Sequence, residues 1–179
     1  MSAENIPEIY ESQNLSPMDY NEFIKSKILS ADELRKKLSA TPGKKVAFTN
    51  GCFDLVHQGH IDYLSKARNM ADILVVGLNT DASVRRLKGS KRPITDEYSR
   101  ALMLASFVFV DFVVLFGEDT PYNLIKTIQP DILIKGSDYK PEDIVGYDIV
   151  KAKGGEVRTL DFLPGFSTSA IEKKILQGG

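Results

Sequence analysis

The chain has 179 residues, of which 42% are hydrophobic and 26% charged, and its formal net charge is −1. These values are typical of a globular protein and give no overall attraction for nucleic acid or anionic lipid. Its one cysteine, Cys52, excludes an internal disulfide framework, and neither a signal sequence nor an apolar run of about 18 residues is found, so we expect a cytoplasmic protein that does not enter the membrane.

Residues 1–43 predict an N-terminal extension with two helices. A serine and proline pair, Ser16 and Pro17, predicts the start of a helix that reaches residue 28 with apolar residues at helical spacing. A Ser-x-x-Glu capping box at residues 30–33 predicts the start of the second helix. We expect the apolar stripes of both helices to pack on the rest of the protein or on a second copy of the chain.

Residues 44–179 are expected to form one domain of alternating strands and helices. Short apolar, β-branched runs predict five buried parallel strands, at residues 46–49, 73–78, 112–116, 132–135 and 156–160. Helical patterns lie between and after them, at residues 61–71, 99–108, 121–128, 142–151 and from about residue 169. This order predicts an α/β fold: a Rossmann-like, doubly wound, parallel five-stranded sheet with helices on both faces, whose ligands bind beyond the carboxyl ends of the strands.

Both histidines of the chain, His57 and His60, lie in the segment NGCFDLVHQGH that follows the first strand. Gly51 permits a tight exit from the strand, and Gly59 keeps the backbone beside the histidines free of a side chain. The following helix begins near His60, so helix N–H groups and two imidazoles together favour an anion such as phosphate. A structural role is the alternative for a single histidine, and a zinc site is disfavoured because no further cluster of cysteine or histidine accompanies the pair.

A basic segment follows the second strand and contains Arg85, Arg86, Lys88, Lys91 and Arg92. We expect a flexible arm that closes over polyphosphate, with Lys88 and Arg86 as its main contacts, although a solvated charged surface is the alternative. Arg100 lies in an otherwise apolar helix. Its guanidinium either points into the cleft or lies in water at the end of a stem that follows the helix surface.

The last two strands are also followed by polar segments. KGSDY, which begins at Lys135, offers an ammonium for phosphate and, in Asp138, a carboxylate for sugar hydroxyls or a metal; a capped turn is the alternative. Ser167, Thr168 and Ser169 stand at a helix start, where their hydroxyls either suit phosphate oxygens or serve as helix caps. No general base lies near Cys52 in the sequence, so we expect a small filler there and not a nucleophile.

In order and spacing these segments resemble the cytidylyltransferase-like nucleotidyltransferases. The segments that match, between about residues 44 and 175, are NGCFDLVHQGH, RRLKG, the arginine of DEYSR, KGSDY and PGFSTSAI. The NGCFD opening, RRLKG-x-x-RPI and KG-x-DYKPEDI are most similar to the branch that adenylylates D-glycero-β-D-manno-heptose 1-phosphate. Glycerol-3-phosphate cytidylyltransferases are similar but usually open with GTFD and carry an arginine before the last ST element, which DFLPGFSTS lacks. Ser169 stands where this branch more often has threonine.

The resemblance implies transfer of an adenylyl group from ATP to the sugar 1-phosphate, with release of pyrophosphate. Alignment of two anions and stabilisation of charge would carry the reaction, with Mg²⁺ held largely by triphosphate oxygens and water. The residues expected to be catalytic are His57, His60, Lys88 and Arg100. Nucleotide contacts are expected from Asn50, Gly51, Cys52, Phe53, Asp54, Gly59, Asn79, Arg86, Lys135, Gly136, Ser167, Thr168 and Ser169. The acceptor is expected to contact Asp138 and Tyr139.

Other functions remain open at this point, because the chemistry of the residues does not fix the base, the sugar or its anomer. The second enzyme hypothesis is a cytidylyltransferase for glycerol 3-phosphate or a similar small phosphate. A non-catalytic ATP-binding module is disfavoured by the combination of histidine pair, basic segment and hydroxyl cluster, and a dinucleotide oxidoreductase by the absence of G-x-G-x-x-G in the first turn. We further expect a separate sugar kinase that supplies the acceptor, and a homodimer to which the first helix contributes.

Overall fold

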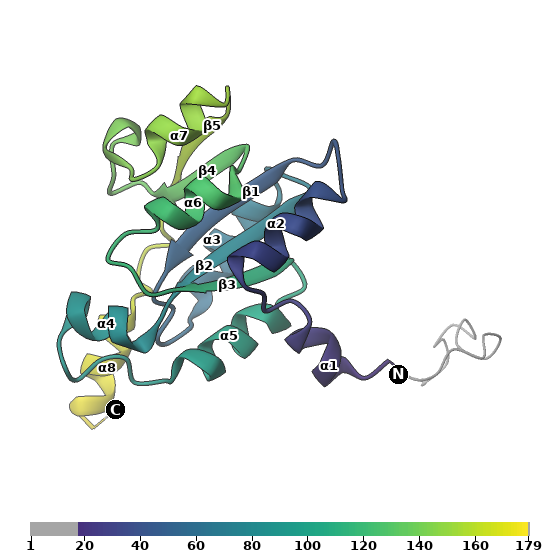
Figure 1. The fold of residues 1–179 in the computed structure, drawn as a ribbon. Helices are drawn as coiled ribbons and strands as arrows, with labels where there is room; N and C mark the ends of the chain where they lie inside the picture. The colour runs from purple at the N-terminus through teal and green to yellow at the C-terminus, as the bar shows by residue number, and fades with distance from the viewer. Residues whose placement is uncertain (1–17, 179) are drawn as a thin grey trace, which may run out of the picture.

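The computed structural model describes residues 18–178. Its centre is a five-stranded sheet in the order β3-β2-β1-β4-β5, with every neighbouring pair parallel (Figure 1). The strands are β1 (Val46–Gly51), β2 (Ile73–Asn79), β3 (Phe112–Phe116), β4 (Ile132–Gly136) and β5 (Glu156–Leu160). The strand order reverses between β1 and β4, and ligands of doubly wound sheets bind at such a reversal. The predicted Rossmann-like α/β fold is thus confirmed.

Two hydrophobic cores cover the two faces of this sheet. On one face α3 (Gln58–Arg68) and α5 (Glu97–Ser106) pack on the strands through residues such as Leu64 and Leu104. On the other face α2 (Ala31–Ser39), α6 (Tyr122–Ile128) and α7 (Tyr147–Ala152) cover the strands through residues such as Leu34, Ile125 and Val150. The strands are therefore buried on both sides, which explains their continuous apolar runs.

One helix of the structure was not expected from the sequence. Residues 85–88, the first part of the predicted flexible arm, belong to α4 (Asp81–Lys88), and the Thr80 side chain caps this helix by accepting from Ser83 N. The predicted helix at residues 142–151 is also wrong in extent. A 3₁₀ turn (Pro141–Asp143) and α7 replace it, because Gly146 between them takes a left-handed conformation with φ 92°.

The N-terminal helix differs from its prediction as well. α1 (Tyr20–Lys25) begins after Asp19, whose carboxylate accepts from the backbone of the first turn, and it ends well before residue 28. Ile28 instead bridges to Val113 and extends the sheet edge beside β3. The proposed cap at Ser16 and Pro17 lies outside the described residues. The capping box before α2 is present, with Ser30 and Glu33 bonded reciprocally.

The division of the chain at residue 43 remains a prediction. α2 belongs to the core of the sheet domain in packing, since Leu34 is fully buried against strand residues. The last helix, α8 (Thr168–Leu176), follows β5 after a turn. Over residues 18–178, every helix is too short or too polar to traverse a lipid bilayer.

Candidate active site

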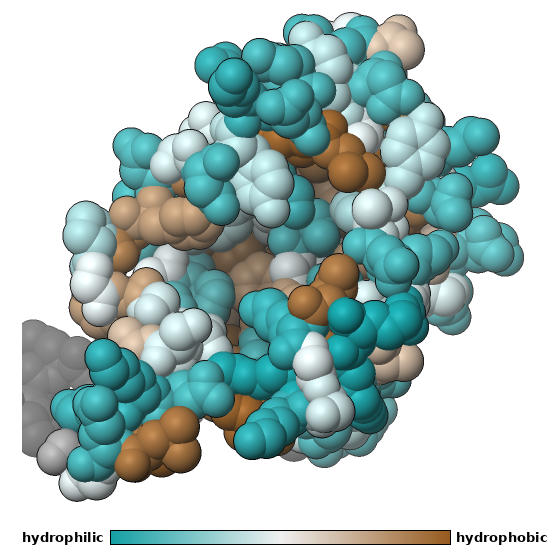
Figure 2. Space-filling model, turned by 90° about the vertical axis from the view of Figure 1, so that its left-hand side faces the viewer, coloured by the Kyte–Doolittle hydropathy of each residue, from teal (hydrophilic) through white to brown (hydrophobic). Residues whose placement is uncertain are grey.

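A cavity of about 730 Å³ lies at the carboxyl ends of the strands. Figure 2 views the molecule from the side toward which these strand ends point and shows a hollow near the middle of that face. A volume of this size is within the range of small-molecule sites in proteins. The predicted site residues that line it are Asn50, Gly51, Cys52, Phe53, Asp54, His57, Gly59, His60, Asn79, Lys88, Lys135, Gly136, Asp138, Tyr139, Ser167, Thr168 and Ser169.

The edge of the sheet divides this cavity into two sides. Phe48 of β1 and Leu133 of β4 are register partners in the core under α6, so Asn50 and Lys135, two residues further along, face the same side. Thr49 faces the opposite side, where its hydroxyl bonds the phenol of Tyr63 on α3 over 2.8 Å. We call the part around the α3 N-terminus the histidine side, formed by His57, Gly59, His60 and residues 167–169. We call the other part the lysine side, formed by Asn50, Cys52, Asn79 and Lys135.

On the histidine side the two imidazoles are stacked. The ring centroids of His57 and His60 lie 3.9 Å apart, and His57 N donates to His60 Nδ1 over 3.3 Å. Burial, then the charges of His57 and Lys88, lower the pKa of His60 to about 4. Burial also lowers the pKa of His57. Both rings are therefore neutral near pH 7 in the free protein, and each has one N–H to donate.

Two helix N-termini meet beside these rings. His57 is the N-cap of α3 and Ser167 is the N-cap of α8. The two starts touch, because Thr168 Oγ1 donates to Leu55 O over 3.4 Å and a Cβ on Gly59 would lie 3.2 Å from Phe166 Cβ. Free backbone N–H groups at both starts and the dipoles of both helices favour an anion at this point.

The side chains of Lys88 and Arg86, both on α4, lie in different places. Lys88 lines the cavity and its charge acts on His60. The guanidinium of Arg86 lies outside the cavity lining, where it donates to Asp119 Oδ1 over 2.9 Å and to the carbonyl of Gly117 over 2.5 Å. In this arrangement the guanidinium of Arg86 is paired within the protein, and its contact with a triphosphate stays a prediction.

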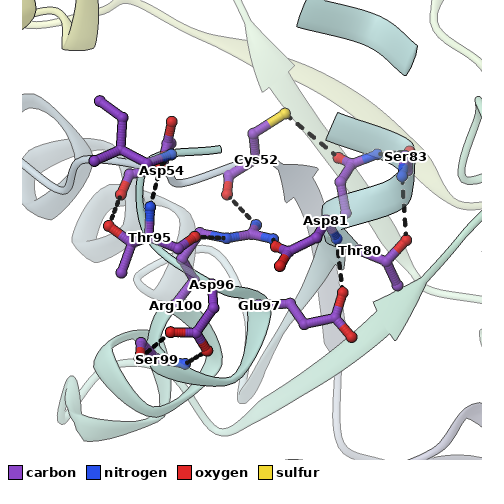
Figure 3. A network of polar contacts seen from close by, with 12 residues as sticks. Cys52, Asp54, Thr80, Asp81, Ser83, Thr95, Asp96, Glu97, Ser99 and Arg100 are labelled. Carbon is purple, nitrogen blue, oxygen red and sulfur yellow. Dashed lines mark hydrogen bonds and ion pairs between the residues drawn. The ribbon is translucent and has the colours of Figure 1, made fainter. Parts of the chain in front are cut away.

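Arg100 is 1% exposed and does not line the cavity. Its guanidinium donates to Cys52 O over 2.6 Å, to Thr95 O over 3.0 Å and to Asp81 Oδ1 over 2.7 Å, as Figure 3 shows. With these acceptors it ties the turn after β1 to the start of α4. All three acceptors are groups of the protein, so in this structure the guanidinium faces the protein and not the cavity; its contact with a triphosphate stays a prediction.

Asp54 forms a second tie between the same regions. Its carboxylate accepts from Ile94 N over 2.7 Å, from Thr95 N over 3.0 Å and from Arg92 over 2.7 Å. Burial raises the pKa of Asp54, but the hydrogen bonds it accepts outweigh burial and hold the pKa below its ordinary value. Arg92 also pairs with Glu172 of α8. The sequence marked Arg92 only as one charge of a basic run, and its role as a link to α8 was missed.

On the lysine side Lys135 is the central cation. Among residues 18–178 its ammonium has neither a hydrogen-bond nor an ion-pair partner, and it lies 5.9 Å from the ring centroid of Tyr139. Burial lowers the pKa of Lys135 to about 8, although Asp138 and Cys52 act in the opposite direction. Asn50 Oδ1 is buried and likewise lacks a partner within the described chain. Both groups are thus available to a ligand.

Several lining residues were missed by the sequence reasoning. The first group, after β3, is Asp119, Thr120 and Pro121, and the second, before α7, is Asp143, Ile144 and Val145. The third group, after β5, is Phe162, Leu163 and Phe166. Tyr63 of α3 and Leu87 of α4 complete the set. The Phe162 ring lies so close over Gly136 that a Cβ there would be 2.1 Å from it. The position of GEDTP directly after the third predicted strand was a signal that could have found the first group.

The donor set does not form a protein-held metal centre. Within residues 18–178, no three His, Cys, Asp or Glu side chains converge on one point. A divalent cation in this cavity would therefore take most of its ligands from the oxygens of a bound phosphate and from water.

The chain is similar to proteins of one family over most of its length. The family model described as cytidylyltransferase-like matches residues 48–173. Bifunctional protein HldE of Citrifermentans bemidjiense is 57% identical over 153 residues, which are 84% of this chain and 31% of that protein. Bifunctional protein HldE of Campylobacter concisus is 52% identical over 165 residues, or 92% and 34% of the two chains. The chain thus spans about a third of the length of these curated relatives.

Solved structures share the fold. The lipopolysaccharide core biosynthesis protein of Thermoplasma volcanium has 29% identity and a TM-score of 0.56, over 68% of this chain and 98% of that chain. A pantoate-β-alanine ligase of Francisella tularensis has 15% identity and a TM-score of 0.55, over 81% and 75% of the two chains. At that identity the second comparison supports the fold alone.

Proposed function

The chain belongs to the cytidylyltransferase-like family, and we propose that it transfers the adenylyl group of ATP to D-glycero-β-D-manno-heptose 1-phosphate, giving ADP-heptose and pyrophosphate. The observation that carries this proposal is the histidine pair, which lies where the N-termini of α3 and α8 meet at the cavity. Neutral donors and two helix starts suit a polyphosphate there. The heptose acceptor is supported by the NGCFD and KGSDYKPEDI segments and by the HldE relatives.

In the proposed reaction a phosphate oxygen of the acceptor forms a bond to the α-phosphorus of ATP. The bond from that phosphorus to the oxygen bridging to the β-phosphate breaks, and the electron pair leaves with pyrophosphate. The attacking oxygen is ionised near neutral pH, so a strong general base is not required. The protein has to hold two anions in line and offset the charge that develops between them.

The residues of the histidine side would do this work. His60 accepts from His57 N at Nδ1, so its one proton is on Nε2, from which it would donate to the triphosphate oxygens. Lys88 would neutralise charge on the β- and γ-phosphates from α4. Arg100 would act indirectly, because it donates to the carbonyl of Cys52 and so holds in place the turn after β1 that leads to the histidines.

Mg²⁺ would enter with ATP as part of the substrate. It would lower the charge of the triphosphate and take its ligands from phosphate oxygens and water. A separate kinase would supply the sugar 1-phosphate, and a homodimer is the proposed assembly.

The test is a pyrophosphate-release assay with ATP or CTP against heptose 1-phosphate or glycerol 3-phosphate. The proposal expects release above background with ATP and heptose 1-phosphate, and far less in the other three combinations. Preference for CTP with glycerol 3-phosphate would support the cytidylyltransferase alternative instead. Tight ATP binding with no pyrophosphate from any combination would make the chain a binding module.

A further inference from the structure

The lysine side has the chemistry of a binding site for one phosphate group with neighbouring hydroxyls. It holds one cation, Lys135, and the partner-less oxygen of Asn50 beside it on the adjacent strand. The cavity wall nearby contributes the carboxylate of Asp143, which precedes Ile144 of the core under α6. Carboxylates accept hydrogen bonds from hydroxyls but repel phosphate, so this side suits a polyol with a single phosphate better than a triphosphate.

The histidine side has the opposite character. Its donors come from two helix starts and two imidazoles, and Lys88 adds a charge from α4. Of the two carboxylates at its border, Asp54 is already occupied by Arg92 and two backbone N–H groups, and Asp138 lies beside Gly136, toward Tyr63 of α3. A polyanion is therefore favoured on the histidine side, and the two substrates of an anion-to-anion transfer can be divided between the two sides of the sheet edge.

We propose that the lysine side is the acceptor subsite, in which Lys135 binds the phosphate of the sugar 1-phosphate and Asn50 and Asp143 bind its hydroxyls. This inference rests on the proposed function and changes the expectation that Lys135 contacts the nucleotide. A partly buried ammonium without a partner loses some of its hydration, and a phosphate dianion would supply the partner. Lys135 would then bring the acceptor phosphate to the α-phosphorus from the side opposite to the departing pyrophosphate.

The burial of Lys135 adds a reason for this assignment. Partial burial lowers the pKa of Lys135 to about 8, and the opposing charges of Asp138 and Cys52 do not offset it. A dianion at hydrogen-bond distance favours the charged form and raises that pKa. Acceptor binding and protonation of Lys135 would thus reinforce each other.

The test separates the two substrates with Lys135→Met, which keeps an unbranched side chain of nearly the same length and removes its charge. The KM for heptose 1-phosphate should rise by about 10- to 100-fold, the loss expected for one charge-assisted contact. The Kd of α,β-methylene-ATP, measured by calorimetry without acceptor, should stay unchanged. Lys135→Arg should recover part of the acceptor affinity. Lys140→Met, an exposed lysine outside the cavity lining, is the matched control and should change neither constant.

Two results would overturn the inference. An unchanged KM for heptose 1-phosphate would remove Lys135 from the acceptor site, and a Kd for the ATP analogue that rises as much as the KM would place the nucleotide on the lysine side. Failure of the proposed function is a separate outcome, seen as no pyrophosphate from the wild-type protein. In that event calorimetric binding of heptose 1-phosphate to wild type and Lys135→Met still decides the subsite, since weaker binding by the variant supports it and equal binding refutes it.

Discussion

His57 N donates a hydrogen bond to Nδ1 of His60 while the two rings stack 3.9 Å apart. The bond requires an unprotonated Nδ1, which fixes the neutral tautomer of His60 with its proton on Nε2. The burial that lowers its pKa to about 4 keeps this neutral form at physiological pH. The pair therefore supplies a neutral donor of fixed geometry. A lysine or arginine at the same position would instead supply a positive charge.

Replacement of His60 should separate the donor from the packing of the ring. His60→Ala removes the Nε2 donor, and we expect kcat to fall by about 10²- to 10³-fold, as for loss of one transition-state donor. The melting temperature should stay nearly unchanged. His60→Gln carries an N–H close to the position of Nε2 and should retain more activity than alanine. Pyrophosphate release under saturating substrates measures the effect, and near-normal turnover of His60→Ala would remove His60 from catalysis.

The titration of the two histidines can be observed directly, because the chain has only these two. NMR of the imidazole C–H groups should show His60 titrating near pH 4 and His57 below its ordinary value. Binding of α,β-methylene-ATP should raise both pKa values, since a neighbouring anion favours the protonated ring. Titration of His60 at or above its ordinary value of about 6.5 in the free protein would contradict the burial and contacts described for it.

The same shift makes a prediction about stability. In the unfolded chain a histidine binds its proton near pH 6.5, whereas folded His60 does so only near pH 4, so the unfolded state takes up the proton first. The free energy of unfolding should therefore decrease as pH falls from about 6.5 to about 4, by roughly 1–3 kcal/mol. Urea unfolding at several pH values measures this, and the decrease should be smaller in His60→Gln. Equal slopes for the two proteins would show that His60 is not its source.

The sequence predicted the sheet well because each strand is buried on both faces and therefore consists of a continuous run of apolar residues. It did not predict α4, because this helix buries only Ser83 and Val84 and charged residues make up much of its surface. The positions of Arg86 and Arg100 depend on acceptors far along the chain, such as Asp119, and local pattern carries no information on such pairs. The division of the cavity by the sheet edge depends on the order of the strands in the sheet. The pattern of apolar residues along the sequence does not determine that order.

Asp54 should matter for stability more than an exposed carboxylate. Asp54→Asn weakens the hydrogen bonds from Ile94 N and Thr95 N and leaves the 12% exposed Arg92 without the more buried of its two charge partners. Arg92 keeps its ion pair with Glu172, so we expect a loss of about 1–3 kcal/mol in the free energy of unfolding. Urea denaturation provides the measurement.

The matched control for this change is Asp119→Asn. It removes the ion pair of Asp119 with Arg86, in which both side chains are largely exposed at 69% and 49%. Such a pair contributes about 0–1 kcal/mol, so the control should unfold almost as the wild type does. Equal losses for Asp54→Asn and Asp119→Asn would show that burial of the Asp54 network adds nothing.

Lys88 should link triphosphate binding to the protonation of His60. Lys88→Met removes a cation of the cavity lining, so the Kd of α,β-methylene-ATP should rise by about 10-fold or more, while the KM for heptose 1-phosphate changes less. The pKa of His60 should also rise, because Lys88 is one of the charges that lower it. Lys91→Met, which removes an exposed lysine of the same basic run outside the cavity lining, should leave both values as in the wild type. If Lys88→Met raised only the KM for the sugar phosphate, Lys88 would belong to the acceptor and not to the triphosphate, and the division of the cavity would need to be redrawn around α4.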